Sequence, residues 1–356
     1  MYFILAIASA VLSLLGVALI KQRWGKQLLD IPNQRSSHSQ PTPRGGGIGF
    51  IIAFAITGTI ASTLTSNLPQ ILLTTPNPSY IWLILTPLAL IGIIDDKRGV
   101  PAVPRYLVQL LAASIMIAHF GLFPLPWLSN LGIIGQIIAI SLTLIGITAL
   151  INFYNFMDGL DGLVASVSAL QLGFLALYLN QPLFLLLAAA LLGFLWWNWS
   201  PAKIFMGDAG STVLGATVAI ALLNNNNQPS LTWSALAVTF PLIGDAIYTL
   251  SRRLIRRENI FKAHRSHLYQ RLQQSGWSHR QVAIAYLTAT ATIILAITTF
   301  GTIGSWLSLI AVIIAIATVE LYLQSRSTFA TSAPKVHQQK PDVSVGSTKI
   351  PAQTLP

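Results

Sequence analysis

Long apolar segments constrain this chain more than any other feature. Runs of about 18 or more apolar residues are typical of transmembrane helices, and eleven such runs divide the 356 residues. They lie at residues 2–20, 46–66, 79–94, 105–121, 131–150, 162–179, 182–198, 209–224, 231–251, 281–300 and 303–323. Only 9% of the residues are charged, against about 25% in a soluble domain. The sequence therefore predicts an all-α polytopic membrane protein with about eleven transmembrane helices.

Basic side chains predict how these helices are oriented. Segments 67–78, 122–130, 180–181, 225–230 and 301–302 contain no Lys or Arg, and all 21 basic residues lie in or beside the alternate segments and in the C-terminal tail. Segments rich in Lys and Arg stay in the cytoplasm, so we expect the N-terminus outside and the C-terminus inside. The net charge of +11 follows from this bias. The sequence provides no soluble basic face on which nucleic acid could bind.

The chain divides into one membrane domain and one tail. Residues 1–324 are predicted to form a transmembrane domain with cytoplasmic loops. Residues 325–356 are rich in Ser, Thr, Pro, Lys and Gln, a composition that predicts a disordered cytoplasmic tail. The sequence contains no cysteine, which excludes disulfide bonds and thiolate metal sites.

Six of the ten acidic residues lie at helix ends that are predicted to face the cytoplasm. They are Asp95, Asp96, Asp158, Asp161, Asp208 and Asp245. Ionisable groups at a bilayer are costly, so they are retained where they bind something. Asp95 and Asp96 are adjacent like charges, and a divalent metal could neutralise them. Taken alone, this pair is better explained by neutralisation through Lys97 and Arg98, which follow directly.

The fifth connecting segment carries the sharpest short motif, Asn155-Phe-Met-Asp158-Gly-Leu-Asp161-Gly. Asp158 and Asp161 are three residues apart and would share one face of a helix or tight turn. No Lys or Arg lies in this segment to neutralise them. Two unpaired carboxylates beside a bilayer favour a ligand site over a structural role.

The seventh connecting segment runs from Asn198 through Phe205 to Asp208, which stands just before a predicted helix. Asp208 fits either a helix N-cap or a metal ligand with open coordination. The tryptophans of this segment are more simply explained as an interfacial belt than as a substrate platform.

Basic residues in two further segments could bind phosphate. Arg44 precedes three glycines that open a helix, where backbone amides can approach an anion; a tight turn explains the glycines equally well. His264, Arg265 and His267 lie in the long ninth segment, and the fork of an arginine suits phosphate. The arginines of this segment could instead set topology or contact anionic lipid. Three other histidines are interpreted as isolated and structural or solvated: His119, His279 and His337.

Together these residues predict a carboxylate-rich, cation-flanked site on the cytoplasmic face. Mg²⁺ prefers oxygen ligands and typically uses one or two carboxylates together with substrate phosphates. Basic residues then hold the remaining phosphate charge. This combination suits phosphoryl transfer, in which positioning and electrostatics supply most of the catalysis.

With these motifs in this order, the chain resembles the polyprenyl-phosphate N-acetylhexosamine-1-phosphate transferases of glycosyltransferase family 4. The resemblance covers roughly residues 1–325 and is carried by Asp95-Asp96 and by segments 155–162 and 205–211. Segment 32–47 is similar to the branch of this family that starts O-antigen or exopolysaccharide synthesis.

The resemblance implies roles for individual residues. Catalytic roles are implied for Asp95, Asp96, Asp158, Asp161 and His267. Substrate binding is implied for Asn155, Asn198, Phe205, His264, Arg265 and Arg44. Mg²⁺, with Mn²⁺ as the alternative, is expected to bind Asp208 and Asp161.

The resemblance also implies a reaction and its partners. The phosphate of undecaprenyl phosphate in the bilayer would attack the β-phosphorus of a UDP-sugar, releasing UMP and leaving a lipid-linked sugar pyrophosphate. The expected location is the plasma (inner) membrane, with the active site on its cytoplasmic face. The sequence leaves open a homodimer, the identity of the sugar and a covalent intermediate.

Two other functions fit the sequence less well. A proton- or cation-coupled secondary transporter would place carboxylates near the bilayer midplane and would show paired broken helices, whereas these carboxylates lie at helix ends. A CDP-alcohol phosphotransferase also uses Mg²⁺, but it resembles this chain less because its aspartates are more closely spaced in one motif.

Overall fold

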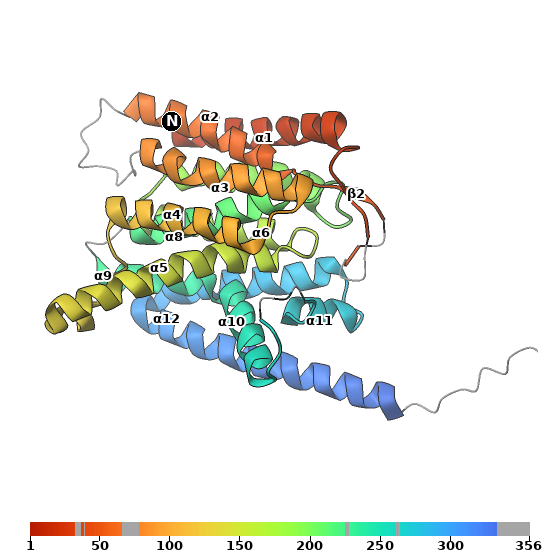
Figure 1. Cartoon of the computed structure of the whole chain (residues 1–356). Coiled ribbons are helices and arrows are strands. Elements are labelled where there is room, and N and C mark those ends of the chain that lie inside the picture. Colours follow the sequence, from red (N-terminus) through yellow and green to blue (C-terminus); the bar gives the residue numbers. More distant parts are fainter. Residues whose placement is uncertain are drawn as a thin grey trace, which may run out of the picture.

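The computed structural model describes residues 1–32, 37–38, 40–65, 78–224, 228–260, 262 and 264–332, and this part is almost entirely helical (Figure 1). The helices are α1 (Tyr2–Trp24), α2 (Gly47–Thr65), α3 (Pro78–Arg98), α4 (Ala102–Phe120), α5 (Gly132–Met157), α6 (Leu163–Tyr178), α7 (Leu183–Asn198), α8 (Asp208–Leu223), α9 (Pro229–Leu236), α10 (Phe240–Ile255), α11 (Leu268–Gln274) and α12 (His279–Ser332). Two short 3₁₀ helices are η2 (Pro126–Leu131) and η3 (Ala237–Thr239). Two short strands, β1 (Leu29–Asp30) and β2 (Thr42–Pro43), pair antiparallel in the first connecting segment.

The predicted all-α, multi-pass membrane class is confirmed. Seven helical segments of the described chain are long and apolar enough to cross a bilayer, and α6, α7 and α8 are shorter apolar helices of 16 residues each. A chain in hydrocarbon must satisfy its own backbone hydrogen bonds, which is why its apolar runs form helices. The count of eleven membrane crossings stays a prediction.

Two elements differ from the simple pattern of apolar runs. The predicted segment 231–251 is a continuous run of α9, η3 and α10. The predicted segments 281–300 and 303–323 belong to α12, which is interrupted at Gly301 with a φ of 56°. The two parts of α12 fold back on each other there (Figure 1). A side chain at Gly304 would collide with the Ala296 carbonyl, so this close return needs glycine.

Helix α8 lies at the centre of the bundle and presents Asp208 at its first turn. Every residue of α8 after Asp208 is buried, and the helix packs against α3 and α5. Small side chains let membrane helices approach closely. A Cβ at Gly92 of α3 would collide with the Ala209 backbone of α8. This contact brings the acidic end of α3 to the start of α8.

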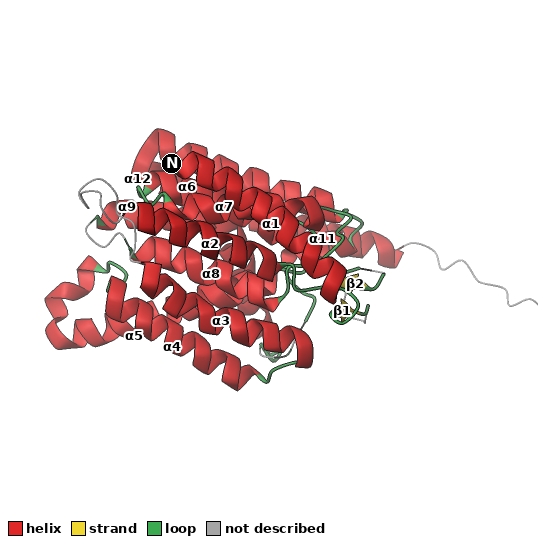
Figure 2. Cartoon of the chain, turned by 90° about the horizontal axis from the view of Figure 1, so that it is seen from above, coloured by secondary structure: helices red, strands yellow, loops and turns green. Residues whose placement is uncertain are grey.

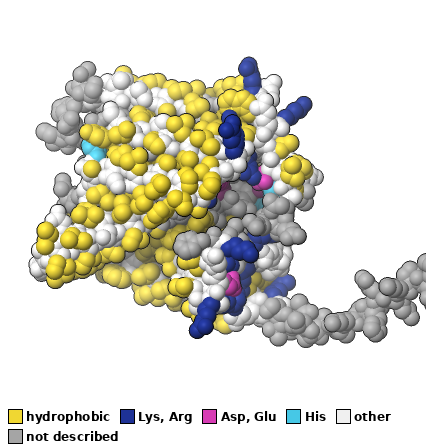
Figure 3. Space-filling view, viewed as in Figure 1, with side chains coloured by type: hydrophobic (Ala, Val, Ile, Leu, Met, Phe, Trp, Pro, Cys, Tyr) yellow, Lys and Arg dark blue, Asp and Glu magenta, His cyan; other side chains and the backbone are white. Residues whose placement is uncertain are grey.

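The outer helices present apolar side chains to their surroundings. Large apolar residues such as Ile133, Leu177 and Leu321 are more than half exposed, as expected for side chains that face lipid. Charged side chains gather toward one end of the molecule (Figure 3). Seen from above, the helices lie side by side, with the short strands at the same end as the charges (Figure 2).

Most of the predicted tail lies outside the described residues. Helix α12 continues to Ser332, so residues 325–332 belong to it. Residues 333–356, which include His337, lie outside the described residues, and the prediction of a disordered tail is therefore untested.

Candidate active site

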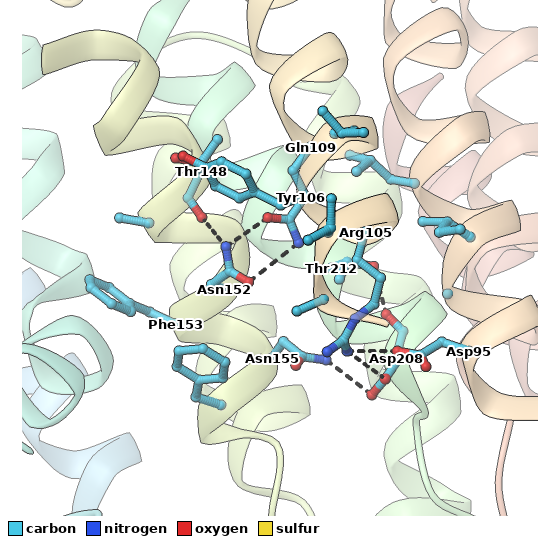
Figure 4. Close-up of a pocket in the computed structure, with 18 of the residues that line it drawn as sticks. Asp95, Arg105, Tyr106, Gln109, Thr148, Asn152, Phe153, Asn155, Asp208 and Thr212 are labelled. Carbon is cyan, nitrogen blue, oxygen red and sulfur yellow. Dashed lines mark hydrogen bonds and ion pairs between the residues drawn. The ribbon is translucent and has the colours of Figure 1, made fainter. Parts of the chain in front are cut away.

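Carboxylates from α3 and α8 meet an arginine from α4 (Figure 4). The guanidinium of Arg105 lies 2.6 Å from Oδ2 of Asp95 and 3.7 Å from Oδ2 of Asp208. The Val100 amide donates a second hydrogen bond to Asp95, at 2.6 Å. Charge-assisted hydrogen bonds of this kind are short and strong. Arg105 therefore links Asp95 and Asp208, which belong to two separate motifs and both lie at helix ends that are predicted to face the cytoplasm.

Asp96 lies deeper than Asp95 and is incompletely neutralised. Its Oδ1 accepts a hydrogen bond from the Asp208 amide at 3.1 Å and lies 3.8 Å from Arg44. Arg44 is held more closely by Asp30, at 2.6 Å. The Oδ2 atom of Asp96 is buried and has no hydrogen-bond partner within the described part of the chain. A buried carboxylate oxygen without a partner is costly, which points to an additional cation or donor.

Two residues of the fifth-segment motif reach the same cluster. The Asn155 amide donates hydrogen bonds of 3.0 Å to Oδ1 of Asp208 and to the Ser211 hydroxyl. Asp158 follows the end of α5, and burial, with the negative charges of Asp208 and Asp96, raises the pKa of Asp158 to about 8. The structure thus brings together Asp95, Asp96, Asp158 and Asp208, with Arg44 and Arg105 as the nearest cations.

Asp161 forms its polar contacts outside this cluster, although its charge also acts on Asp158. Its Oδ2 accepts a hydrogen bond from the Ala202 amide at 3.1 Å and lies 3.2 Å from Nδ1 of His279. Although burial opposes it, the contact with His279 lowers the pKa of Asp161 below its usual value. The interpretation of His279 as an isolated residue is therefore wrong, because its ring pairs with Asp161 and contacts the Ser37 carbonyl at 3.1 Å.

Asn198 is buried and holds two loops together. Its side-chain oxygen accepts a hydrogen bond from the Gly162 amide at 3.1 Å, and its amide donates to the Ile204 carbonyl at 3.0 Å. The side chain thus contacts the backbone at the end of the fifth-segment motif. Its contribution to a nucleotide pocket would consequently be indirect, through the position of that motif.

Phe205 lies at the surface between the first and seventh segments. Its backbone amide donates to the Pro43 carbonyl at 2.8 Å, and the Gly46 amide donates to the Phe205 carbonyl at 2.9 Å. Its partly exposed ring lies edge to face against the ring of His38, with centroids 4.8 Å apart. The ring is accessible, so a role in base stacking stays a prediction.

The ninth segment places two histidines beside the acidic cluster. His264 and His267 line one cavity with Asp95 and Asp208, and their ring centroids are 5.0 Å apart. Burial lowers the pKa of His264 to about 4, so its ring is neutral near pH 7. His267 is buried, and its Nδ1 lies 3.5 Å from Asp245. Arg265 points elsewhere, toward Ser37 at 3.3 Å and Gln273 at 3.4 Å.

Asp245 is fully enclosed and organises this segment. Its two oxygens accept hydrogen bonds from the backbone amides of Leu268 and Tyr269, at 2.8 and 3.0 Å, at the start of α11. The Tyr286 hydroxyl donates a third, at 2.7 Å. A carboxylate at a helix N-terminus stabilises that helix. Asp245 therefore positions the histidines.

An apolar cavity of about 750 Å³ opens from the acidic cluster between α3, α4 and α5 (Figure 4). Leu88, Leu107 and Ile145 are among the apolar side chains that line it, and Asp95, Arg105 and Asp208 lie in its wall. The cavity thus joins an apolar space to a charged end, an arrangement that fits an amphipathic ligand.

Sequence reasoning missed three polar residues of this cavity: Arg105, Gln109 and Asn152. The side-chain amides of Gln109 and Asn152 donate to each other, at 3.3 and 2.7 Å. Arg105 and Gln109 are four residues apart within an apolar helix and so share a face. This spacing is the signal that could have identified them, because polar groups at membrane depth face a partner or a cavity.

The described residues contain no group of three or more His, Asp or Glu side chains arranged to hold a metal ion by themselves. The predicted pair of metal ligands, Asp208 and Asp161, is not brought together, since Asp161 pairs with His279. The carboxylates that face Asp208 are instead Asp158, Asp96 and Asp95.

Comparison with known proteins assigns the chain to a family. Residues 79–226 match the model of glycosyl transferase family 4. A Bacillus subtilis (strain 168) protein, named a probable undecaprenyl-phosphate N-acetylglucosaminyl 1-phosphate transferase, is 32% identical over 309 residues, which cover 82% of this chain and 83% of that protein. The chain belongs to glycosyl transferase family 4.

Other family 4 proteins are similar over most of their length. A decaprenyl-phosphate N-acetylglucosaminephosphotransferase of Mycolicibacterium smegmatis is 31% identical over 72% of this chain and 71% of that protein. A phospho-N-acetylmuramoyl-pentapeptide-transferase of Staphylococcus haemolyticus is 28% identical over 81% of this chain and 96% of that protein. The segment matched by the family 4 model includes α3 to α8 and therefore the four clustered carboxylates. The resemblance inferred from the sequence is confirmed.

Proposed function

We propose that this protein transfers an N-acetylhexosamine 1-phosphate from a UDP-sugar to undecaprenyl phosphate. The observation that carries the proposal is the apolar cavity that ends at Asp95, Arg105 and Asp208. The names of its relatives support this reaction class, since they describe transferases that act on polyprenyl phosphates.

The cavity suits the lipid acceptor. Its apolar wall between α4 and α5 would hold the first isoprene units, and Arg105 would hold the acceptor phosphate at the charged end. Arginine presents several donors in a fixed fork that matches phosphate oxygens. Asp95 orients this guanidinium through their 2.6 Å contact. His264 and His267, from the opposite wall, would contact the same phosphate.

The reaction forms one phosphorus–oxygen bond and breaks another. An oxygen of the acceptor phosphate attacks the β-phosphorus of the UDP-sugar. The bond from this phosphorus to the bridging oxygen breaks, and the electron pair leaves with UMP. Arg44 and Arg105 lie where they would balance charge on the diphosphate and the acceptor, which is the main task of a phosphoryl-transfer site.

The carboxylate cluster fits Mg²⁺, or Mn²⁺, which also prefers oxygen ligands. Asp96 has a buried oxygen without a partner, and the mutual repulsion that raises the pKa of Asp158 would be relieved by a bound cation. Mg²⁺ usually takes one or two carboxylates and completes its shell with water and phosphates. Asp208 and one neighbouring carboxylate, Asp158 or Asp96, would hold the ion together with substrate phosphates, and the ion would neutralise the diphosphate and the departing UMP. Asp161 would instead position its loop through its contacts with His279 and the Ala202 amide.

We further propose that the protein lies in the plasma (inner) membrane and crosses it eleven times. The N-terminus would lie outside, and the catalytic end would face the cytoplasm. The reversal of α12 at Gly301 would provide the last two crossings. The collection of charges at one end of the molecule supports this orientation (Figure 3), because basic segments remain in the cytoplasm. The protein could act as a monomer or a homodimer.

A direct assay tests the proposed reaction. Purified protein is incubated with undecaprenyl phosphate, Mg²⁺ and one UDP-sugar at a time, and both UMP and the lipid product are measured. The panel includes UDP-N-acetylglucosamine and its N-acetylated fucosamine and quinovosamine relatives. We expect UMP and lipid-linked sugar in equal amounts with at least one donor. UMP release without a lipid product, or no release with any donor, would contradict the proposal.

A further inference from the structure

A second cavity, of about 240 Å³, lies where the end of α10 meets α11. Its charged lining residues are Arg252, Arg253, Arg256, Arg265, Arg271 and Glu258. Five guanidinium groups therefore surround a small space that one carboxylate shares. Like charges this close repel each other unless an anion lies among them.

The carboxylates near this cavity neutralise only part of its charge. Glu258 lies 2.7 Å from Arg253, and Glu320 pairs with Arg271. Within the described chain, neither Arg252 nor Arg256 forms an ion pair with a carboxylate. Arg271 and Arg256 act on Arg252 as neighbouring positive charges, and Glu320, which pairs with Arg271, acts on it as a negative one. The cavity is thus left with an excess of positive charge.

Arg253 indicates a built site. It is only 9% exposed, and one terminal nitrogen donates to the Asn259 carbonyl at 2.8 Å. Its Nε atom is buried and has no hydrogen-bond partner within the described residues. An arginine that only sets membrane topology has no need of burial, because positive charge alone produces that effect. A buried guanidinium with a spare donor suits an anion with several acceptor oxygens.

The surroundings of the cavity favour a ligand at the membrane surface. Leu254 and Ile255, beside Arg253 and Arg256, are 66% and 82% exposed. Exposed apolar side chains next to cations suit the level of lipid headgroups, where acyl chains and phosphates are both within reach. A lipid would place its phosphate among the arginines at the end of α10, while Leu254 and Ile255, which do not line the cavity, indicate the level of the membrane surface.

We propose that this arginine-lined cavity binds the phosphate group of an anionic membrane lipid. It is distinct from the acidic cavity, but the two share a wall. His264 and His267 line the larger cavity, whereas Arg265 and Ser266 line this one. A bound headgroup would therefore brace the segment that carries both histidines. Binding itself does not depend on the transferase reaction, so a binding assay tests this site separately.

The test measures binding of fluorescently labelled phosphatidylglycerol to the purified full-length protein in neutral detergent. The Arg252→Gln/Arg256→Gln variant is expected to bind at least about tenfold more weakly, since each arginine near a phosphate contributes about one factor of five to ten. The matched control, Arg23→Gln/Lys26→Gln, removes two exposed charges outside the cavity and should bind as the wild type does. Glu258→Gln removes the competing carboxylate and should tighten binding, a gain that misfolding cannot produce.

Competing ligands distinguish the source of the phosphate. Unlabelled phosphatidylglycerol should displace the probe, and phosphatidylcholine and inorganic phosphate should not do so at similar concentrations. Displacement by inorganic phosphate at those concentrations would overturn the assignment to a lipid. Equal affinities of the wild type, Arg252→Gln/Arg256→Gln and Glu258→Gln would overturn the site itself.

Discussion

Arg105 contacts two carboxylates that belong to different motifs, Asp95 on α3 and Asp208 on α8. At the scale of single residues, this contact decides which groups can meet a substrate. The same arginine lies in the wall of the apolar cavity, so in the proposed reaction it would hold the acceptor phosphate while it balances Asp95. Like Asp95 and Asp208, Arg105 lies both in the acidic cluster and in the wall of the apolar cavity.

The first prediction concerns this arginine. Arg105→Gln should lower kcat/KM for undecaprenyl phosphate by about 10²–10³-fold, because a preorganised donor to the reacting phosphate is lost. Steady-state assays with each substrate varied in turn measure the effect. Arg98→Gln, an exposed charge at the end of α3, is the control and should stay near wild type. An Arg105→Gln enzyme with an unchanged acceptor response would remove Arg105 from the site.

The second prediction concerns the metal. Chelation with EDTA should abolish turnover, and added Mg²⁺ or Mn²⁺ should restore it. Asp208→Asn should raise the Mg²⁺ concentration for half-maximal activity by at least about tenfold, since a ligand of the ion is weakened. Asp161→Asn should leave this concentration nearly unchanged, because Asp161 contacts His279 instead. The reverse order of sensitivity would return Asp161 to the metal site.

At the scale of elements, contacts between loops hold the site in place. Asp161 of the fifth segment accepts from the Ala202 amide of the seventh and pairs with His279 at the start of α12. The ring of His279 also contacts the Ser37 carbonyl of the first segment. These links fix loops that lie far apart in the sequence around the end of α8, where Asp208 begins.

The third prediction tests this connection with a double-mutant cycle. Asp161→Asn and His279→Gln should each lower kcat/KM for the UDP-sugar, and the double variant should be little worse than either. Residues in direct contact show coupling of about 0.5–3 kcal/mol. Arg280→Gln, an exposed neighbour of His279, should instead combine additively with Asp161→Asn. Additivity of the Asp161 and His279 changes would show that their contact does not matter for activity.

At the scale of the whole molecule, apolar surface and charge are separated. Exposed apolar side chains cover the outer helices, and charged groups collect at one end (Figure 3). The 750 Å³ cavity opens among membrane-spanning helices and ends at this charged end. In the proposed reaction, this arrangement would allow a lipid to stay in the bilayer while its phosphate reaches a water-soluble donor.

The fourth prediction concerns topology, and the absence of cysteine from the sequence makes it simple to test. Single cysteines are introduced as Ser129→Cys, Thr302→Cys and Lys26→Cys, and intact cells are treated with a membrane-impermeant maleimide. Ser129→Cys and Thr302→Cys should react, and Lys26→Cys should react only after permeabilisation. Protection of Thr302→Cys in intact cells would exclude two crossings by α12.

The helical class, the approximate bounds of the helices and the acidic motifs could be predicted from the sequence. Apolar runs in hydrocarbon have few structures open to them, because every backbone group must find a partner within the chain. The predicted run 46–66 thus corresponds to α2, Gly47–Thr65. The sequence predicts six carboxylates at the cytoplasmic helix ends; four of them, Asp95, Asp96, Asp158 and Asp208, lie in one cluster, whereas Asp161 pairs with His279 and Asp245 binds the start of α11.

Tertiary structure decided which of these groups meet. Arg105 joins the site because α4 packs beside α3, and Asp161 pairs instead with His279, more than a hundred residues later in the chain. The burial of Asn198 and the reversal at Gly301 likewise depend on packing between distant segments. The sequence by itself determined the helices and the chemistry of their ends, through local hydropathy and charge. Which side chains pair with each other depended on contacts between residues far apart in the chain, and local sequence patterns do not encode such contacts.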